Sequence, residues 1–343
     1  MSDRNYSGIF MTFEGIEGSG KTSQMKRAEQ ALKHHGYDTV FTREPGGSII
    51  GGHIRRILLD PDVAKGTDEE FDPLTELLLY IADRNQTYSQ RIIPALETGK
   101  SVVVDRSRDS TSVYQGIARG MGFTLTDILN DMATSGISSY FRKPDTFDEY
   151  WKDAISPEIK ALRSSSPSMI GESILFTLQD IELRDTDYSN VKIQETFDPL
   201  TELILFLAYE NQVISNSIRK GNSADIMDSL QMRDYDAEAK VIQDRMAGML
   251  DTIAAYDTNS SLPDSIRRGD YAKTAVLPDI TFLIDIDVEE SFKRMNRQMQ
   301  SSGREFGKTL DRIELEAEEF HYALRQGYLD VAARFPERIK IID

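Results

Sequence analysis

A short run near the start of the chain combines glycines, a lysine and a threonine at a spacing that suits phosphate chemistry. It consists of Gly15, Ile16, Glu17, Gly18, Ser19, Gly20, Lys21 and Thr22, and it fits the pattern G-x-x-x-x-G-K-[ST]. Glycines let backbone N–H groups turn inward around phosphate oxygens, and the N-terminus of a following helix adds positive potential. In such a loop the lysine reaches the β- and γ-phosphates of a nucleoside triphosphate, and the threonine ligates Mg²⁺. We expect Lys21 to be catalytic and Thr22 to bind the metal.

This loop by itself does not separate kinases from other proteins that use nucleoside triphosphates. The chain contains no Asn-Lys-x-Asp motif, which argues against a GTPase. None of the variable positions inside the loop is basic. The positive charge that stabilises a migrating phosphoryl group must therefore come from other segments.

Further segments add charged and aromatic residues: Thr42-Arg-Glu-Pro-Gly-Gly47, Leu79-Tyr-Ile-Ala-Asp-Arg84, Asp105-Arg106, Tyr114-Gln-Gly116 and, near the end, Leu310-Asp-Arg-Ile-Glu314. Together with Phe13-Glu-Gly-Ile-Glu-Gly-Ser-Gly-Lys-Thr22, their order and spacing resemble the thymidylate kinase family. The match covers about 1–136 and 276–343 and is far more specific than the loop alone. The resemblance implies phosphorylation of dTMP to dTDP with ATP as donor and Mg²⁺ as cofactor. It also implies a homodimer formed through helices beside the acceptor site.

The resemblance assigns roles around the acceptor nucleotide. Tyr80 stands where the family has a phenylalanine that stacks on thymine, and an aromatic face suits a base. Arg84, one helical turn further on, would donate to a thymine carbonyl. Arg106 would grip the dTMP phosphate, because a guanidinium matches a phosphate bidentately. Asp105 would hold Mg²⁺ through water. The other expected acceptor contacts are Glu17, Arg43, Pro45, Ser110, Thr111, Tyr114 and Gln115.

Each of these assignments has a plainer alternative. Tyr80 suits a hydrophobic core equally well, Arg84 suits a solvated helix face, and Asp105 suits a turn at a strand end. Among the further contacts, Glu17 is expected near the acceptor 3′-hydroxyl and the metal. Tyr114 is expected to crowd the 2′ position and so to favour deoxyribose.

The segment Met299–Thr309 corresponds to a mobile lid in the resemblance. Arg297 and Arg304 are the expected catalytic donors to the migrating phosphoryl group, with Arg294 and Lys308 as alternates. The alternative is that these residues are solvated charges on a surface loop.

Short apolar runs and helical patterns alternate around these motifs. We expect strands at 9–13, 39–42, 101–105, 280–286 and 338–342, and helices at 20–35, 49–59, 73–96, 289–299 and 311–334. Strands separated by helices indicate an α/β fold, here a parallel sheet of the P-loop NTPase type flanked by helices. The core comprises 1–136 and 276–343.

Residues 137–275 have a different character and contain an internal repeat. Phe71-Asp-Pro-Leu-Thr-Glu-Leu77 recurs identically at 197–203, and Asn85-Gln86 recurs at the same offset as Asn211-Gln212. Upstream, Ile50-Gly51 and Ile54 are echoed by Ile170-Gly171 and Ile174. We interpret the region as a mainly helical insertion that partly duplicates 48–86. A shared helix-start signal is the alternative, since Asp-Pro before an apolar run is common at helix N-termini.

The insertion is expected not to be a second active site. The equivalents of Asp83 and Arg84 in it are Tyr209 and Glu210, and no second phosphate loop accompanies them. It would instead pack on the core, mimic a dimer-forming helix or offer a surface to an unknown partner.

The composition indicates which partners and which cellular compartment to expect. The net charge is −17 and no basic run is present, which disfavours nucleic acid as a partner. The chain has no cysteine, no membrane-length apolar stretch and a polar start at 1–7, so we expect a cytoplasmic protein.

Two rival functions remain at this level. A kinase for a different deoxynucleoside monophosphate is the first, because Ser107 replaces the family's tyrosine and the insertion could remodel the pocket. A non-catalytic nucleotide sensor that acts through the insertion is the second. Because Lys21, Asp105 and Arg106 are present, the non-catalytic sensor is the least favoured of the proposed functions.

Overall fold

The computed structural model describes residues 6–137, 168–180, 198–220, 234–256, 264–268, 270–301, 312–313 and 316–343. In this part of the chain, five parallel strands form one sheet in the order β2-β3-β1-β4-β5. These are β2 Thr39–Arg43, β3 Ser101–Asp105, β1 Phe10–Glu14, β4 Ile280–Ile284 and β5 Ile339–Ile342. The α/β class and the parallel sheet expected from the sequence are confirmed.

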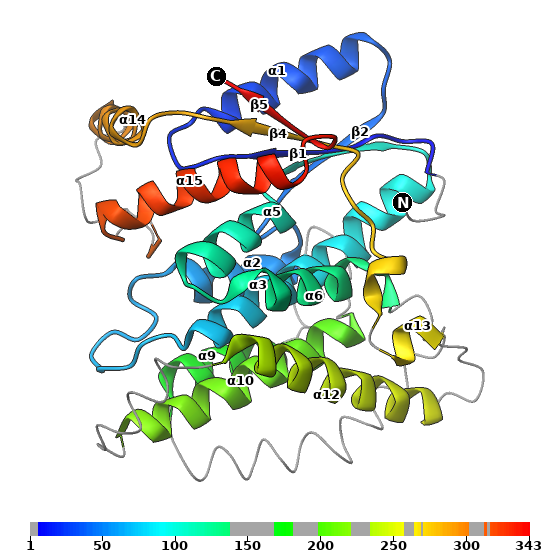
Figure 1. The fold of residues 1–343 in the computed structure, drawn as a ribbon, viewed down its shortest axis with the longest axis vertical. Coiled ribbons are helices and arrows are strands. Elements are labelled where there is room, and N and C mark those ends of the chain that lie inside the picture. Colours follow the sequence, from blue (N-terminus) through cyan, green and yellow to red (C-terminus); the bar gives the residue numbers. More distant parts are fainter. Residues whose placement is uncertain are drawn as a thin grey trace.

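Helices cover both faces of this sheet, and a further helical layer lies beyond them (Figure 1). The helices of the core are α1 Lys21–His34, α2 Ile49–Leu59, α3 Pro73–Thr87, α4 Ile93–Glu97, α5 Arg108–Thr111, α6 Gly122–Thr134, α14 Val288–Ser301 and α15 Glu318–Arg334, with π-helical turns η1 Tyr88–Ile92 and η2 Ser112–Ala118. The region 137–275 contributes α9 Met169–Asp180, α10 Pro199–Lys220, α12 Tyr235–Tyr256, α13 Asp264–Arg267 and the 3-10 turn η5 Tyr271–Lys273. None of the described helices has the length and apolar character needed to span a membrane.

Strand alternation divides the sheet into two packed faces. Met11, Phe13 and Val103 point to one face, where Met25, Ala28 and Leu32 of α1 cover them. Phe10, Val102 and Val104 point to the other face and pack against η1 and α4. Further along this second face, Leu283 and Ile339 pack against α15. Both faces are thus apolar, as a parallel sheet requires.

Helix α3 begins where the sequence signals a start. Asp72 is its N-cap and accepts hydrogen bonds from the N–H groups of Leu74 at 3.0 Å and Thr75 at 3.4 Å. Pro73 follows at the first helical position, where a missing N–H costs nothing. In the same way Ser48 caps α2 by accepting from Gly51 N–H at 2.8 Å. These caps fix both helices beside the carboxyl edge of the sheet.

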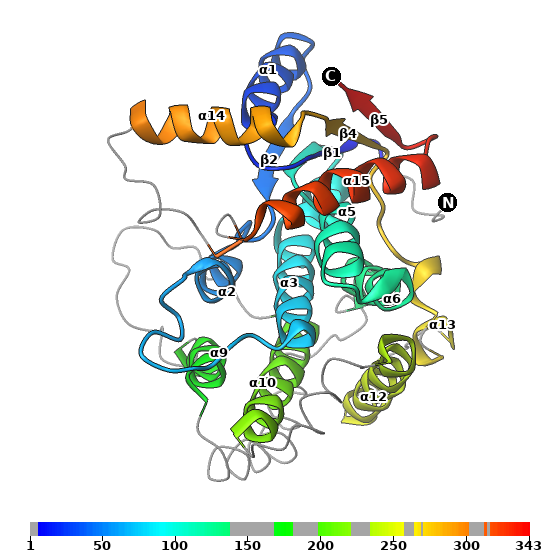
Figure 2. The ribbon, with the colours of Figure 1, turned by 60° about the vertical axis from the view of Figure 1, so that its left-hand side comes forward.

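The helices of the insertion stack on the core helices rather than on the sheet. Figure 2 shows α9 beneath α2, α10 beneath α3 and α12 beneath α6. One hydrophobic cluster runs through both layers, from Leu77 and Leu129 to Leu203 and Met246. The insertion leaves and re-enters the core at neighbouring points, because Val276 N–H donates to Thr134 O at 2.9 Å. The described parts of the insertion are helical, as expected.

Some boundaries differ from those expected. The helix expected at 73–96 is interrupted by the π-helical turn η1. The helix expected from 311 begins only at Glu318, because Ala317 is extended with φ −61° and ψ 157°. Before it, Arg312 is drawn onto the end of α2, where its backbone N–H donates to Leu59 O at 3.0 Å and its Nε to Leu58 O at 2.9 Å. Tertiary contacts here override the local helical pattern.

Candidate active site

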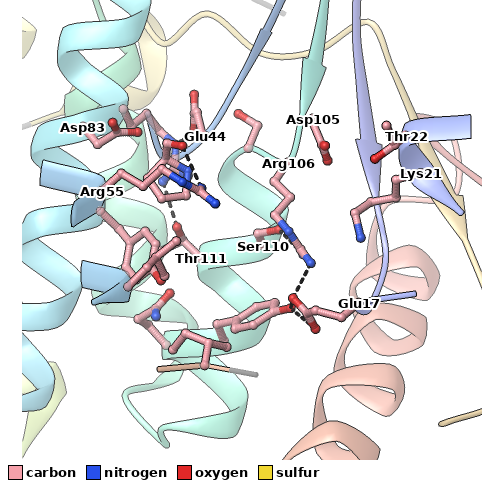
Figure 3. A pocket seen from close by; sticks show the side chains of 18 of the residues that line it. Glu17, Lys21, Thr22, Glu44, Arg55, Asp83, Asp105, Arg106, Ser110 and Thr111 are labelled. Carbon is pink, nitrogen blue, oxygen red and sulfur yellow. Dashed lines mark hydrogen bonds and ion pairs between the residues drawn. The ribbon is translucent and has the colours of Figure 1, made fainter. Parts of the chain in front are cut away.

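A cavity of about 330 Å³ opens where the carboxyl ends of β1 and β3 meet α2, α3 and η2. Figure 3 shows Lys21 and Thr22 on one side of this cavity, Arg55 and Asp83 on the other, and Arg106 between them. Polar loops that follow parallel strands gather at this edge of the sheet, so the topology alone brings the separate sequence motifs together.

The phosphate loop has the backbone that its glycines predict. Gly15 and Gly18 have φ of 138° and 69°. A Cβ at Gly15 would lie 2.4 Å from Ile284 O, so only glycine fits there. The Lys21 ammonium sits in the loop and donates to Gly15 O and Ile16 O, each at 2.9 Å. Burial, and then the nearby Arg106, lower the pKa of Lys21 to about 8.

Arg106 is the centre of a partly buried polar network. Its Nη2 donates to Glu17 Oε1 at 2.6 Å and its Nη1 to the Tyr328 hydroxyl at 2.8 Å. The Tyr114 hydroxyl also donates to Glu17, at 2.8 Å. Arg106 has φ 64° and is the one non-glycine residue of the described chain with a positive φ. A strained backbone held by several partners marks a residue whose position matters for function.

The pKa values of two carboxylates in this network are shifted in opposite directions. Burial raises the pKa of Glu17, but Arg106 and Lys21 outweigh it and hold that pKa below its usual value. Burial, and then Asp109, raise the pKa of Glu14 to about 8. Glu14 accepts from Ser107 N–H at 2.7 Å and from the Ser110 hydroxyl at 2.6 Å. Glu14 thus fixes the turn that carries Arg106.

Asp105 and Thr22 provide oxygens for a metal. Asp105 ends β3, and its Oδ1 is buried with no hydrogen-bond partner among the residues that the structure describes. Thr22 follows Lys21 at the start of α1, and both residues line the cavity. A buried carboxylate oxygen without a partner, next to a hydroxyl and a phosphate loop, is a donor set that fits Mg²⁺.

The opposite wall of the cavity holds Arg84 rigidly. This side chain is 2% exposed, and its Nε donates to Glu44 Oε2 at 2.8 Å. Its Nη1 donates to Thr111 Oγ1 at 2.9 Å and to Asn130 Oδ1 at 2.5 Å. Next to it, Asp83 accepts from Gly46 N–H at 2.7 Å, and burial followed by the charge of Glu44 raises its pKa well above the usual value. Arg84 is a fixed buried group and not a solvated helix residue.

Most of the expected site residues line this one cavity. They are Glu17, Gly18, Lys21, Thr22, Pro45, Tyr80, Arg84, Asp105, Arg106, Ser110, Thr111, Tyr114 and Gln115. Arg43 does not line it: its side chain is exposed at the end of β2. Arg55 lines the cavity instead and donates to Pro45 O at 3.0 Å. The sequence alone does not distinguish the two arginines, because both lie near the Glu44-Pro45 segment.

Only two of the four expected lid donors, Arg294 and Arg297, belong to the described part of the chain. Arg297 lies exposed on α14 and does not line the cavity. Arg304 and Lys308, with most of the expected lid, lie outside the described residues. The alternate Arg294 is the one near the phosphate loop, where its Nη1 donates to Ser19 O at 3.5 Å.

Sequence reasoning missed several residues of the site. Besides Arg55, these are Glu14, Glu44, Asp83, Ser107 and Tyr328. Glu44 and Asp83 stand beside singled-out residues, so a search for buried partners of the arginines would have found them. Tyr328 lies in α15, far from every motif, and the sequence carries no local signal for it.

Comparisons with known proteins agree with this geometry. A family model described as thymidylate kinase matches residues 13–147 and 182–343, which is most of the chain. A thymidylate kinase from Desulfosudis oleivorans is 50% identical over 137 residues, which are 40% of this chain and 59% of that protein. One from Caldanaerobacter subterraneus is 47% identical over 130 residues, 38% of this chain and 60% of that protein. The matched part thus spans about three fifths of these curated relatives.

A solved structure also aligns with the chain. It is a thymidylate kinase from Ehrlichia chaffeensis, 21% identical, and the alignment covers 98% of this chain and 92% of that one with a TM-score of 0.43.

Proposed function

The chain belongs to the thymidylate kinase family, and we propose that it transfers the γ-phosphoryl group of ATP to dTMP. One observation carries the proposal. A single cavity has a phosphate loop at one end and a wall of Tyr80 and Arg84 at the other, with Arg106 between them. A triphosphate at the loop and a nucleoside monophosphate at the wall would meet at Arg106.

The chemistry asks little covalent work of the protein. An oxygen of the acceptor phosphate attacks the γ-phosphorus in line, and the bond from that phosphorus to the β,γ-bridging oxygen breaks, so that ADP leaves. Charge spreads over the transferred group, and cations already in place stabilise it without reorganisation. Lys21, which is buried, and Arg106, which is partly buried, are positioned cations of this kind.

Mg²⁺ belongs with this donor set. Thr22 and Asp105 are the residues that would hold it, and a bound Mg²⁺ would supply positive charge that offsets the negative charge of the phosphates. Glu17 fixes Arg106 through the 2.6 Å ion pair and Tyr114 through a 2.8 Å hydrogen bond. This keeps the guanidinium at the junction of the two substrates.

The acceptor wall suits a pyrimidine base. Tyr80 presents an aromatic side chain for stacking. Glu44 and Asn130 hold Arg84 from behind, so its orientation toward the cavity is set before any ligand arrives. Arg55, two turns into α2, adds a positive charge to the acceptor side of the cavity.

The insertion has no such arrangement, and we propose that it is not catalytic. At the positions of Asp83 and Arg84 it carries Tyr209, which is buried, and Glu210, which pairs with Arg245 of α12. We place the enzyme in the cytoplasm, where its substrates are made and where a chain with no cysteine needs no disulfide.

A coupled assay of ADP release tests the function. ATP and Mg²⁺ are supplied with dTMP, dUMP, dGMP or dCMP, and the highest kcat/KM is expected for dTMP. A higher kcat/KM for any other monophosphate would replace dTMP as the acceptor. ADP release that no monophosphate stimulates would contradict kinase activity altogether.

A further inference from the structure

The internal repeat is also a repeat in three dimensions. Asp198 caps α10 by accepting from the N–H groups of Leu200 at 2.9 Å and Thr201 at 3.4 Å, as Asp72 caps α3. Ser168 caps α9 by accepting from Gly171 N–H at 2.8 Å, the same distance as from Gly51 N–H to Ser48. The pair α9–α10 is therefore a second copy of the pair α2–α3. A shared helix-start signal does not account for a match that extends over two capped helices.

The two copies face each other through reciprocal side-chain bonds. Asn85 Nδ2 donates to Asp198 Oδ1 at 2.5 Å and to Thr201 Oγ1 at 2.9 Å. Asn211 Nδ2, its repeat equivalent, donates to Asp72 Oδ1 at 2.6 Å and to Thr75 Oγ1 at 2.8 Å. If the two copies are exchanged, the bonds of Asn85 become those of Asn211, and the reverse.

The hydrogen bonds between side chains and backbone groups show the same two-fold relation. Gln86 Oε1 accepts from Asp198 N–H at 2.9 Å, and Gln212 Oε1 accepts from Asp72 N–H at 3.0 Å. The Thr75 hydroxyl donates to Ala208 O at 3.4 Å, and the Thr201 hydroxyl donates to Ala82 O at 3.5 Å. Contacts in which residue i meets j and j meets i define a two-fold, isologous interface, the kind that normally joins two copies of one chain.

This interface is buried and apolar around its polar pairs. Leu77 and Leu78 of α3 and Leu203 and Ile204 of α10 are at most 2% exposed. Asp72 and Asp198 are each 2% exposed, and both have partners from the opposite copy. A buried polar network that is satisfied only in this register fixes one mutual arrangement of the two helices.

The two copies differ at the positions that line the acceptor site in α3. Tyr80 of α3 lines the cavity, whereas its equivalent Phe206 is fully buried. Arg245 of α12 lies 6.0 Å from the Phe206 ring centroid and pairs with Glu210, so α12 fills the space where a second site would open. The second copy keeps the mutual interface of α3 and has lost its chemistry.

We infer that the insertion takes the place of a second copy of this chain. Helices α9 and α10 cover, within one polypeptide, the face of α2 and α3 that a twin chain would otherwise cover, and the protein is a monomer. A homodimer through the helices beside the acceptor site, as the family resemblance suggested, would have to displace α10. In this monomer the insertion holds α3, and with it Tyr80 and Arg84, from behind.

The absence of cysteine allows a direct test on the full chain. Light scattering after gel filtration is expected to give the mass of one chain, 38.8 kDa, over a wide concentration range. The mirror-related variants T75C/A208C and A82C/T201C, oxidised mildly, are expected to form a link within the chain, seen as faster migration at monomer mass.

The matched control keeps both cysteines in α3. Under two-fold pairing of α3 with α3 of another chain, Thr75 would meet the partner's equivalent of Ala208, which is Ala82. T75C/A82C is therefore expected to stay unlinked in the monomer. A mass of two chains for the unmodified protein, or covalent dimers from T75C/A82C, would overturn the inference. The mass measurement needs no substitution and stands even if a variant folds poorly.

Discussion

Helices α3 and α10 start with the same residues and pair with each other, yet only one of them serves the cavity. Asp72 with Asp198 and Asn85 with Asn211 are positions that agree between them, and these residues lie on the shared face. Tyr80 and Phe206 are positions that differ, and they lie on the faces turned away. The comparison shows that such a helix has two separate roles, which are to pair with its copy and to line the cavity. In α10 the pairing role is retained, whereas the cavity-lining role of α3 is lost.

The largest effect is expected from the loss of Lys21, a residue of the phosphate loop that the insertion lacks. Lys21→Ala should lower kcat by about 10²–10³-fold, because a positioned cation at the migrating phosphoryl group is lost. Its fold should remain, since among the described residues the hydrogen bonds of Lys21 go to loop carbonyls. Steady-state ADP release measures this, with Lys240→Ala as control because that lysine is exposed on α12. Full activity of Lys21→Ala would disprove the role of the loop.

Equivalent positions of the two helices should respond in opposite ways. Tyr80→Ala should raise the KM for dTMP about tenfold or more through lost stacking, with a small change in stability. Phe206→Ala should cost about 3–5 kcal/mol in the free energy of unfolding, because the ring is fully buried, and should leave the KM unchanged. Denaturant unfolding and acceptor titrations measure both. Equal KM changes would break the proposed separation of duties.

The shared face should instead respond symmetrically. Asn85→Ala and Asn211→Ala each remove one hydrogen bond to a buried aspartate, which keeps its cap bonds, and each should cost about 1–3 kcal/mol. That loss would lower the Tm of either variant by several degrees and by similar amounts. Calorimetry of the two variants side by side decides the matter. A loss confined to Asn85→Ala would show that the insertion does not support α3.

The effect that is smallest per pH unit concerns stability against pH and belongs to the core alone. The pKa of Glu14 is raised to about 8 in the folded protein, so the folded state binds a proton that the unfolded state releases above its ordinary pKa. The stability from this group is complete below that ordinary pKa and is lost as pH rises through about 8. The loss is at most about 1.4 kcal/mol per pH unit.

Glu14→Gln isolates this contribution. Gln keeps the shape and cannot titrate, so the variant should lack the part of the decline in stability that the unmodified protein shows as pH rises toward 8. Urea unfolding at several pH values gives the difference. Parallel curves for the two proteins would mean that Glu14 does not hold a proton in the fold.

Much of the site was predictable because its chemistry dictates residue types at short spacing. Lys21 and Thr22 come after the loop that follows β1, Asp105 and Arg106 stand at the end of β3, and the parallel sheet gathers strand ends at one edge. The order of strands and helices followed from apolar periodicity for the same reason. Local patterns of this kind survive without knowledge of tertiary contacts.

The remainder depended on contacts between distant segments. The choice of Arg55 over Arg43 depends on which way each side chain points, and Tyr328 enters the network from α15. The late start of that helix reflects Arg312 bonding to the end of α2. The repeat was visible in the sequence, but its reciprocal bonds needed the two helices in place.

The pairing of β4 with β1 sets an order of events during synthesis. β1 needs Ile280–Ile284 as a neighbour, and this strand is made after the whole insertion. Chains emerge from their N-termini, and local or earlier segments associate first. Helix α10 thus meets α3 while the sheet is still incomplete. A neighbour tethered in the same chain also has a far higher effective concentration than a free one. The pairing face is closed before another chain can compete for it.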